Sequence, residues 1–394
     1  MLKNPCKPNQ WEFNAKGVPT GTPFRAFLFL LTLALVFSGC RKEDDEPNTA
    51  DYNRGALLTN YADNLIIPAY ETWAADMESL TSALDALESN TDQTNLDVAR
   101  SALHTARLSW QSASLFDFGP AFTQGLNAVA NVYPLDVEQL TENLEESEVN
   151  LEIPGNLSAG GFEGLDYLLF GIGENDADIL DHLAGNGQTA ALPYAQQIAE
   201  LLRGKAQLVL SGWTTDGDSY RATYVVSTGT DVGSSMGLTL NAFNRIYEQE
   251  VRKNKIGLPS GGMTFSMSPL PDHVEGAFSQ DHSLAYLKAA LVAVENAFYG
   301  IGADGTDRDG FDDYLSSLDA QYNGQSLVDI IAAQQDDIRS TVDGLPEPLI
   351  DAVVNQQSDC LDAYTELQQI VVLYKVDMMS AFGILITYLD NDGD

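Results

Sequence analysis

Apolar residues recur at alternating steps of three and four along much of this chain, and this spacing constrains the fold more than any other feature. Such spacing places apolar side chains on one face of a helix, and that face has to be buried against partners. Residues 88–92 separate the first two runs and contain helix N-cap candidates, so we predict an antiparallel helical hairpin. The first run is Ile66, Tyr70, Trp73, Met77, Leu80, Leu84 and Leu87, and the second is Leu96, Ala99, Leu103, Ala106, Trp110 and Ala113.

Further helical runs follow, and alternating strand patterns are scarce. We therefore predict an all-α fold made of two four-helix-bundle-like domains, residues 53–215 and 216–394, with a boundary at the turn after Trp213. The further predicted helices cover residues 194–213, 236–247, 284–298, 330–338 and 367–388.

The first forty residues have the features of a bacterial export signal. Four basic residues precede an apolar run over residues 26–37, which is too short to span a bilayer comfortably but suits a signal-peptide core. Ser38 and Gly39 come next, and residues 36–40 resemble a lipobox, in which the cysteine is lipidated and becomes the new N-terminus. We predict a lipoprotein signal peptide over residues 1–39 and lipidation of Cys40. The alternative is an ordinary signal peptide that ends near a cysteine.

An acidic stretch, residues 40–52, follows the predicted lipid site. A lysine and several acids directly after the cysteine resemble the surface-export signal of some outer-membrane lipoproteins, although a solvated tether would have the same composition. We predict an outer-membrane lipoprotein that faces the periplasm or is exposed at the cell surface. Cys360 is the one cysteine left after Cys40, so the mature chain can form no intrachain disulfide.

The net charge of the chain narrows the range of partners. The formal charge is −37, and removal of residues 1–39, with four bases and one acid, changes it to −40. Clustered positive charge is needed to bind phosphate backbones, so we expect no nucleic-acid partner. The hydrophobic fraction of 44% is ordinary for a globular protein, and most of the acidity is expected to serve solubility.

Several segments in matching order and spacing resemble the imelysin family. They are residues 66–70, 110–120, 133–136 and 255–261, the last with Val274, Glu275 and Ser279, and then Asp377, Gly383 and residues 392–394 near the end of the chain. The resemblance implies two helical bundles in a bacterial periplasmic protein or outer-membrane lipoprotein. Members of this family include iron-regulated proteins linked to metal uptake, and some were described as metallopeptidases.

The family's hallmark is Gly-x-His-x-x-Glu at the start of a helix. The corresponding segment here, residues 161–171, has Glu163 and Asp166 in place of the histidine and the glutamate. Residues three apart share a helix face, and such an all-oxygen pair favours calcium, magnesium, manganese or ferric iron over zinc. The resemblance points to Glu275 as a third ligand. The alternative is that both acids merely interact with the helix dipole in a first turn.

These features lead us to predict a metal-binding, iron-related component of uptake at the outer membrane that works with metal-uptake partner proteins. The predicted cofactor is an iron ion or another oxygen-preferring cation held by Glu163, Asp166 and Glu275. One alternative is a metal-dependent peptidase of the imelysin type, against which the missing hallmark histidine argues. Another is a non-catalytic surface interaction protein that has lost the metal site. We assign no catalytic residues.

Overall fold

The computed structural model describes residues 52–146, 149–187, 189–215 and 219–388. The predicted signal peptide, Cys40 and the tether up to residue 51 lie outside these residues. The all-α prediction is confirmed: the strands of the described part are two short ones, β1 (Gln321–Tyr322) and β2 (Gln325–Ser326), which form an antiparallel hairpin.

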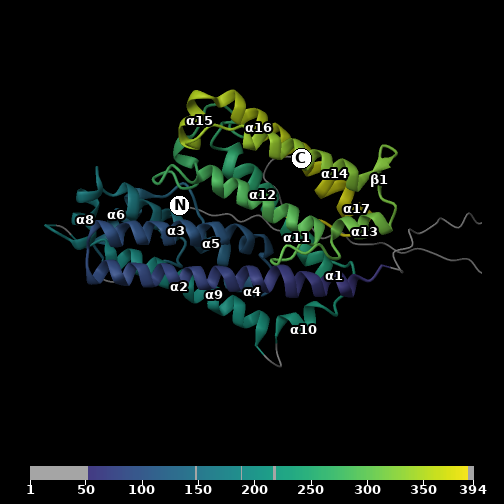
Figure 1. Cartoon of the computed structure of the whole chain (residues 1–394), viewed down its shortest axis with the longest axis horizontal. Coiled ribbons are helices and arrows are strands. Elements are labelled where there is room, and N and C mark those ends of the chain that lie inside the picture. Colours follow the sequence, from purple (N-terminus) through teal and green to yellow (C-terminus); the bar gives the residue numbers. More distant parts are fainter. Residues whose placement is uncertain (1–51, 147–148, 188, 216–218, 389–394) are drawn as a thin grey trace, which may run out of the picture. The chain divides into compact units, whose positions relative to one another are not determined.

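The predicted N-terminal hairpin is confirmed. Helices α1 (Arg54–Asn60), η1 (Tyr61–Ile66) and α2 (Ile67–Ser89) run without a break, and α3 (Gln93–Ala113) returns along α2 (Figure 1). Asp92 is the N-cap of α3, and its side chain accepts a hydrogen bond from Asn95 N at 3.0 Å. This bond satisfies one of the free N–H groups at the start of the helix.

Short helical segments lie between α3 and the long helix that completes the first half of the chain. The long helix, α9 (Leu192–Thr214), packs along α2, so α2 is covered by both α3 and α9. In chain order the segments are η2 (Ser114–Phe116), α4 (Pro120–Thr123), α5 (Leu126–Ala130), α6 (Val137–Leu144), η3 (Leu157–Ala159), α7 (Gly161–Asp166), η4 (Tyr167–Gly171), α8 (Asp176–Ala184) and α9 (Leu192–Thr214).

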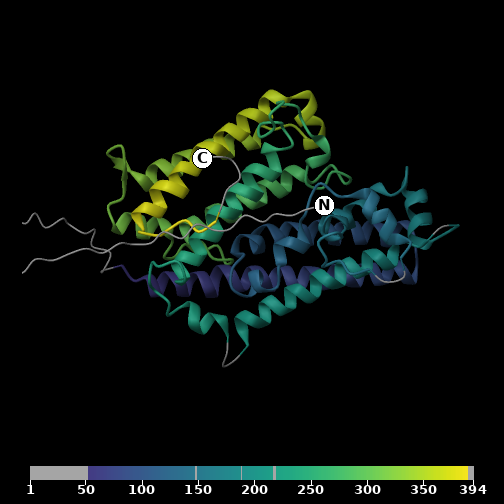
Figure 2. The same cartoon turned by 180° about the vertical axis from the view of Figure 1, so that it is seen from behind.

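The second half is again helical, and its helix α12 (Ser283–Tyr299) packs against α3 of the first half. Helices α14 (Leu327–Asp343) and α16 (Gln357–Val371) pack against each other, as Figures 1 and 2 show in two views. In chain order the elements are α10 (Tyr220–Tyr224), α11 (Ser235–Ile246), η5 (Tyr247–Gly257), η6 (Pro271–His273), α12 (Ser283–Tyr299), α13 (Phe311–Ser317), the β1–β2 hairpin, α14 (Leu327–Asp343), α15 (Leu349–Asn355), α16 (Gln357–Val371), η7 (Val372–Met378) and α17 (Met379–Ala381).

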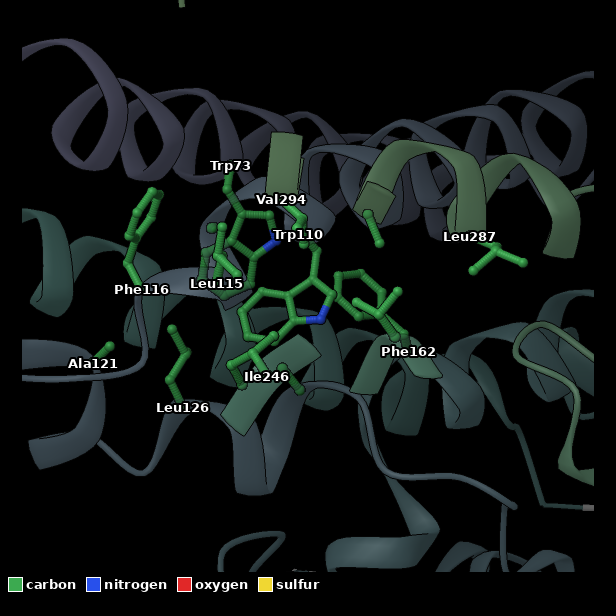
Figure 3. Packing of buried hydrophobic residues seen from close by; sticks show 14 of the residues in the cluster. Trp73, Trp110, Leu115, Phe116, Ala121, Leu126, Phe162, Ile246, Leu287 and Val294 are labelled. Carbon is green, nitrogen blue, oxygen red and sulfur yellow. The ribbon is translucent and has the colours of Figure 1, made fainter. Parts of the chain in front are cut away.

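Aromatic residues form the part of the core where α2, α3 and α7 meet. The ring centroids of Trp73 and Trp110 are 4.9 Å apart, and Phe162 lies 6.2 Å from Trp110 (Figure 3). Val294 of α12 reaches the same cluster. The heptad-like positions of the predicted hairpin are thus core positions, and Phe162 fastens the hallmark helix α7 to them.

The last predicted helix, residues 367–388, begins ten residues too late and ends seven residues too late, because α16, η7 and α17 run without a break from Gln357 to Ala381. The helix ends at Ala381, and residues 384–388 are not helical, although the apolar spacing continued to Tyr388. Gly383 has φ +66°, a conformation that favours glycine. Ile384 N donates to Met379 O at 2.9 Å, the bond that closes a helix C-terminus. A glycine stop signal therefore overrides the periodicity.

The division into two domains stays a prediction. The described residues belong to one compact unit, and α9 ends just before the predicted boundary near residue 215. Over the described ranges, every helix is too short or too polar to cross a membrane.

Candidate functional site

The hallmark segment forms helix α7, and a glycine sets its start. Gly161 has φ +64°, and a Cβ atom there would lie 2.6 Å from Ala130 O. Only glycine therefore fits this position without strain. Glu163 and Asp166 follow on the same face of α7, as predicted, and both are fully buried.

Both carboxylates of α7 bind backbone N–H groups of one loop from the second half of the chain. Gly276 N donates to Glu163 Oε1 at 2.9 Å. Phe278 N and Ser279 N donate to Asp166 Oδ2 at 2.9 and 3.1 Å. Each buried acid therefore has donors from a segment more than a hundred residues away, and together they hold residues 276–279 against α7.

A buried arginine lies between the acids. Arg107 of α3 forms an ion pair with Glu163 through Nη2, and its Nε lies 3.3 Å from Glu275 Oε1. Its Nη2 also lies 3.3 Å from Asn131 Oδ1, and its guanidinium carbon is 4.9 Å from the Tyr286 ring centroid. The guanidinium thus binds two carboxylates and faces an aromatic ring, a site that suits arginine better than lysine.

Glu275 is the most fully bound of the three acids. Its Oε2 forms an ion pair with Lys255 of η5. Its Oε1 accepts hydrogen bonds from Asn131 Nδ2 at 2.9 Å and from Gln111 Nε2 at 3.1 Å, in addition to Arg107. Both oxygens of this buried carboxylate are therefore bound by donors of the chain itself.

The five charged residues Arg107, Glu163, Asp166, Lys255 and Glu275 form what we call the ion-pair cluster. Burial raises the pKa of Glu163 to about 7 although Arg107 opposes the shift, and burial likewise raises the pKa of Asp166. Burial also disfavours ionised Glu275, but Lys255 and Arg107 outweigh it and lower the pKa to about 2. Two cations face three carboxyl groups, so one proton on the α7 pair would make the cluster neutral.

Tyr286 links the ion-pair cluster to a pair of half-buried histidines. Its hydroxyl lies 3.2 Å from His104 Nδ1, and the His104 ring stacks on His282 with centroids 3.8 Å apart. Burial, followed by His282 and Arg107, lowers the pKa of His104 to about 4. His104 is therefore neutral at physiological pH, and it adds no positive charge beside Arg107.

The structure brings Glu163 and Glu275 together on Arg107, while Asp166 binds the loop of residues 276–279, and in this arrangement the three acids do not fit a metal ion. A metal would need oxygen lone pairs that here accept hydrogen bonds from guanidinium, ammonium, amide and backbone donors. The described residues contain no group of three or more His, Cys, Asp or Glu side chains placed to hold a metal ion. Metal ligation by these acids stays a prediction.

Sequence reasoning missed Arg107 and Lys255, the two cations of the cluster. A signal for Arg107 was present, because it lies four residues after Leu103 and three before Trp110, on the inward face of the predicted helix. A charged residue at an inward position needs a buried counter-ion. Another aspartate-rich stretch, residues 304–310, is a loop with an Asp304–Arg308 ion pair that leads into α13.

Comparisons with known proteins identify the family that the sequence motifs resemble. The profile of one family, described as imelysin, matches residues 66–373. The chain belongs to the imelysin family. An iron-regulated protein A from Synechococcus elongatus is 26% identical over 312 residues, which are 75% of this chain and 78% of that protein.

Two solved structures share the imelysin fold with this chain. A protein described as an iron-regulated protein A precursor from Parabacteroides distasonis aligns with a TM-score of 0.67 over 84% of this chain and 95% of its own, at 19% identity. An imelysin-like protein from Psychrobacter arcticum aligns with a TM-score of 0.63 over 88% and 99%, again at 19% identity. At these identities the likeness concerns the fold.

Proposed function

We propose that this imelysin-family protein is a lipid-anchored component of iron-related uptake at the outer membrane, and that it acts by binding a partner and not by catalysis. The observation that supports a non-catalytic role is that groups of the protein itself already bind the acids of the predicted site. Arg107 and Lys255 bind Glu163 and Glu275 from inside the protein, where a catalytic metal would have to sit. The link to iron rests on the name of the cyanobacterial relative.

In this proposal the ion-pair cluster has a structural role, as a fixed contact between the two halves of the chain. Its residues come from α3, α7, η5 and the loop of residues 274–279, so it ties the two halves of the chain together. The cost of removing these charges from water offsets much of their attraction, so we propose that the pairs fix the geometry of this contact more than they add to net stability. The scaffold would then present its outer surface to uptake proteins.

A metal-binding role at the same acids is the second candidate, favoured by Glu163 and Glu275, two buried carboxyl groups that bind the same guanidinium. It requires Arg107 to leave Glu163 and Glu275, because a cation and a guanidinium cannot share these oxygens. Metal binding would therefore be coupled to a movement of the Arg107 side chain.

Calorimetric titration of the metal-stripped protein distinguishes the two candidates. Ferric, ferrous, calcium and zinc ions are titrated into the wild type and into a Glu163→Ala/Asp166→Ala variant whose fold is checked by circular dichroism. Our proposal expects the same weak heats from both proteins, since the numerous surface acids remain. Tight binding by the wild type that the variant loses would establish the metal-binding role. Peptide hydrolysis abolished by chelation would establish the metallopeptidase alternative.

Lipid anchoring has a separate test, because Cys40 lies outside the described residues. The full-length precursor is expressed in a bacterium that processes lipoproteins, and the N-terminal peptide is analysed by mass spectrometry. We expect an acylated Cys40 and a chain in the outer-membrane fraction, and we expect a Cys40→Ser variant to leave that fraction. An unmodified Cys40 in a soluble chain would contradict the anchoring.

A further inference from the structure

Four exposed aliphatic side chains occur on two segments that flank helix α11. Val226 and Val232 precede the helix and are 72% and 46% exposed. Leu385 and Ile386 belong to the segment after α17 and are 69% and 41% exposed. Single exposed aliphatics are common on soluble proteins, so the significance of these four depends on whether they lie together.

Contacts with α11 bring the two segments together. Asn241 Nδ2 donates to Leu385 O at 3.0 Å and to Gly237 O at 2.8 Å, while Thr387 N donates to Asn241 Oδ1 at 2.7 Å. One turn earlier, a Cβ atom on Gly237 would lie 3.2 Å from Val232 O. Both segments therefore meet over the first turns of α11.

The same place is where the first described helix begins. Arg54 Nε donates to Thr228 O at 2.6 Å, and Ser235 N, at the start of α11, donates to Ser227 O at 3.2 Å. Figure 1 shows α1 next to α11. The segment of Val226 and Val232 thus lies at the start of α1, and the segment of Leu385 and Ile386 contacts Asn241 of the neighbouring helix α11.

The length of chain before α1 indicates what these side chains face. Cys40 precedes Arg54 by fourteen residues, which can span at most about 50 Å. The continuous helix from α1 through α2 has 36 residues and is about 54 Å long. A lipid on Cys40 therefore holds the start of α1 within about 50 Å of the bilayer, whereas the far end of α2 can lie about 54 Å farther away.

We propose that Val226, Val232, Leu385 and Ile386 form a lipid-contact surface that rests on the bilayer when Cys40 is acylated. This inference depends on the lipid anchoring proposed above. The contact is weak by itself, and the anchor makes it effective by raising the local concentration of membrane. Asp231 is exposed beside Val232, and the chain is strongly acidic, so the surface suits zwitterionic lipid and not anionic lipid.

Hydrogen–deuterium exchange on the acylated full-length protein tests the surface. The protein is placed on vesicles of phosphatidylcholine and phosphatidylethanolamine and compared with the Cys40→Ser protein in solution. We expect exchange in residues 225–234 and 384–388 to slow at least twofold on the vesicles, and anionic phosphatidylglycerol to reduce this protection.

Two matched variants make the result specific. Val226→Asp/Leu385→Asp should abolish the protection while the chain stays folded, because both side chains are already exposed. Val98→Asp/Val292→Asp is the control, since these valines are 50% and 51% exposed on α3 and α12. The control should keep the protection.

Other outcomes would overturn the inference. Unchanged exchange on vesicles with a confirmed acyl group would refute the surface but leave the anchoring intact. A Cys40 without an acyl group would refute both. Protection that appears with outer-membrane protein extracts but not with pure lipid would show that the patch binds a protein instead.

Discussion

At the residue scale, Arg107 is the side chain on which the ion-pair cluster depends. Arg107→Met leaves Glu163 and Glu275 buried without their shared cation, and we expect a loss of about 3–5 kcal/mol in the free energy of unfolding. Urea denaturation at pH 7 measures this loss.

Arg203→Met is the matched control, because Arg203 pairs with Glu200 and Glu78 on the surface. Exposed ion pairs contribute little, so this variant should lose at most about 1 kcal/mol. Equal losses in the two variants would mean that the Arg107 pairs contribute no more than a surface bridge.

Glu163 should give the protein an unusual pH dependence. Its folded pKa of about 7 lies above the ordinary value of 4.5, so the folded state binds more protons between these limits. The contribution of Glu163 to stability is therefore greatest below about pH 4.5 and decreases as the pH rises to about 7. The stability of the wild type relative to Glu163→Gln should decrease over this window by about 1–3 kcal/mol, measured by urea denaturation at a series of pH values. A difference that is constant with pH would contradict the raised pKa.

Glu275 should show the opposite sign. Its folded pKa of about 2 lies below 4.5, so its contribution is present above about pH 4.5 and is lost as the pH falls toward 2. The stability of the wild type relative to Glu275→Gln should therefore decrease on acidification through this window. Denaturation curves for both variants, recorded in the same buffers, would separate the two carboxylates of one cluster.

At the element scale, the start of α7 should be intolerant of any side chain. Gly161→Ala would force a Cβ atom toward Ala130 O at a positive φ, and we expect a loss of about 2–4 kcal/mol. Gly204 is an interior residue of α9 with nothing within 4 Å of an added Cβ. Gly204→Ala should therefore stabilise the protein by about 0.5–1 kcal/mol, and thermal unfolding would show shifts of opposite sign. Shifts of the same sign would contradict the assigned start of α7.

The elements were predictable from sequence where a long apolar face had to be buried. The hairpin of α2 and α3 and the long helix α9 followed from spacing and caps, and the start of α7 at Gly161 followed from the family resemblance. The C-terminal helix was predicted to end seven residues too late, because the spacing that includes Leu385 gave no sign of the stop at Gly383.

The candidate site was only half visible in the sequence. The resemblance identified its three acids, but Arg107 and Lys255 lie 56 and 92 residues from Glu163 along the chain. Only the folded chain shows that these cations occupy the space between the acids. Backbone donors such as Gly276 N have no sequence signature at all.

At the scale of the whole molecule, the ion-pair cluster and the packing of α12 on α3 join the two halves of the chain. We therefore expect a single cooperative thermal transition, with equal van't Hoff and calorimetric enthalpies. The predicted boundary near residue 215 would instead allow two transitions if each half were an independent domain. Differential scanning calorimetry decides between these descriptions.

The central claim is that Arg107 takes the place of a cation among Glu163, Asp166 and Glu275. Terbium is a hard cation that suits carboxylate ligands, and its emission is sensitised by nearby tyrosines such as Tyr286. The most direct measurement is terbium luminescence of four metal-stripped proteins. They are the wild type, Arg107→Ala, and each of these two with Glu163→Gln/Asp166→Asn added. Our account predicts emission dependent on these two acids only after Arg107 is removed. Stoichiometric emission from the wild type that Glu163→Gln/Asp166→Asn abolishes would contradict it.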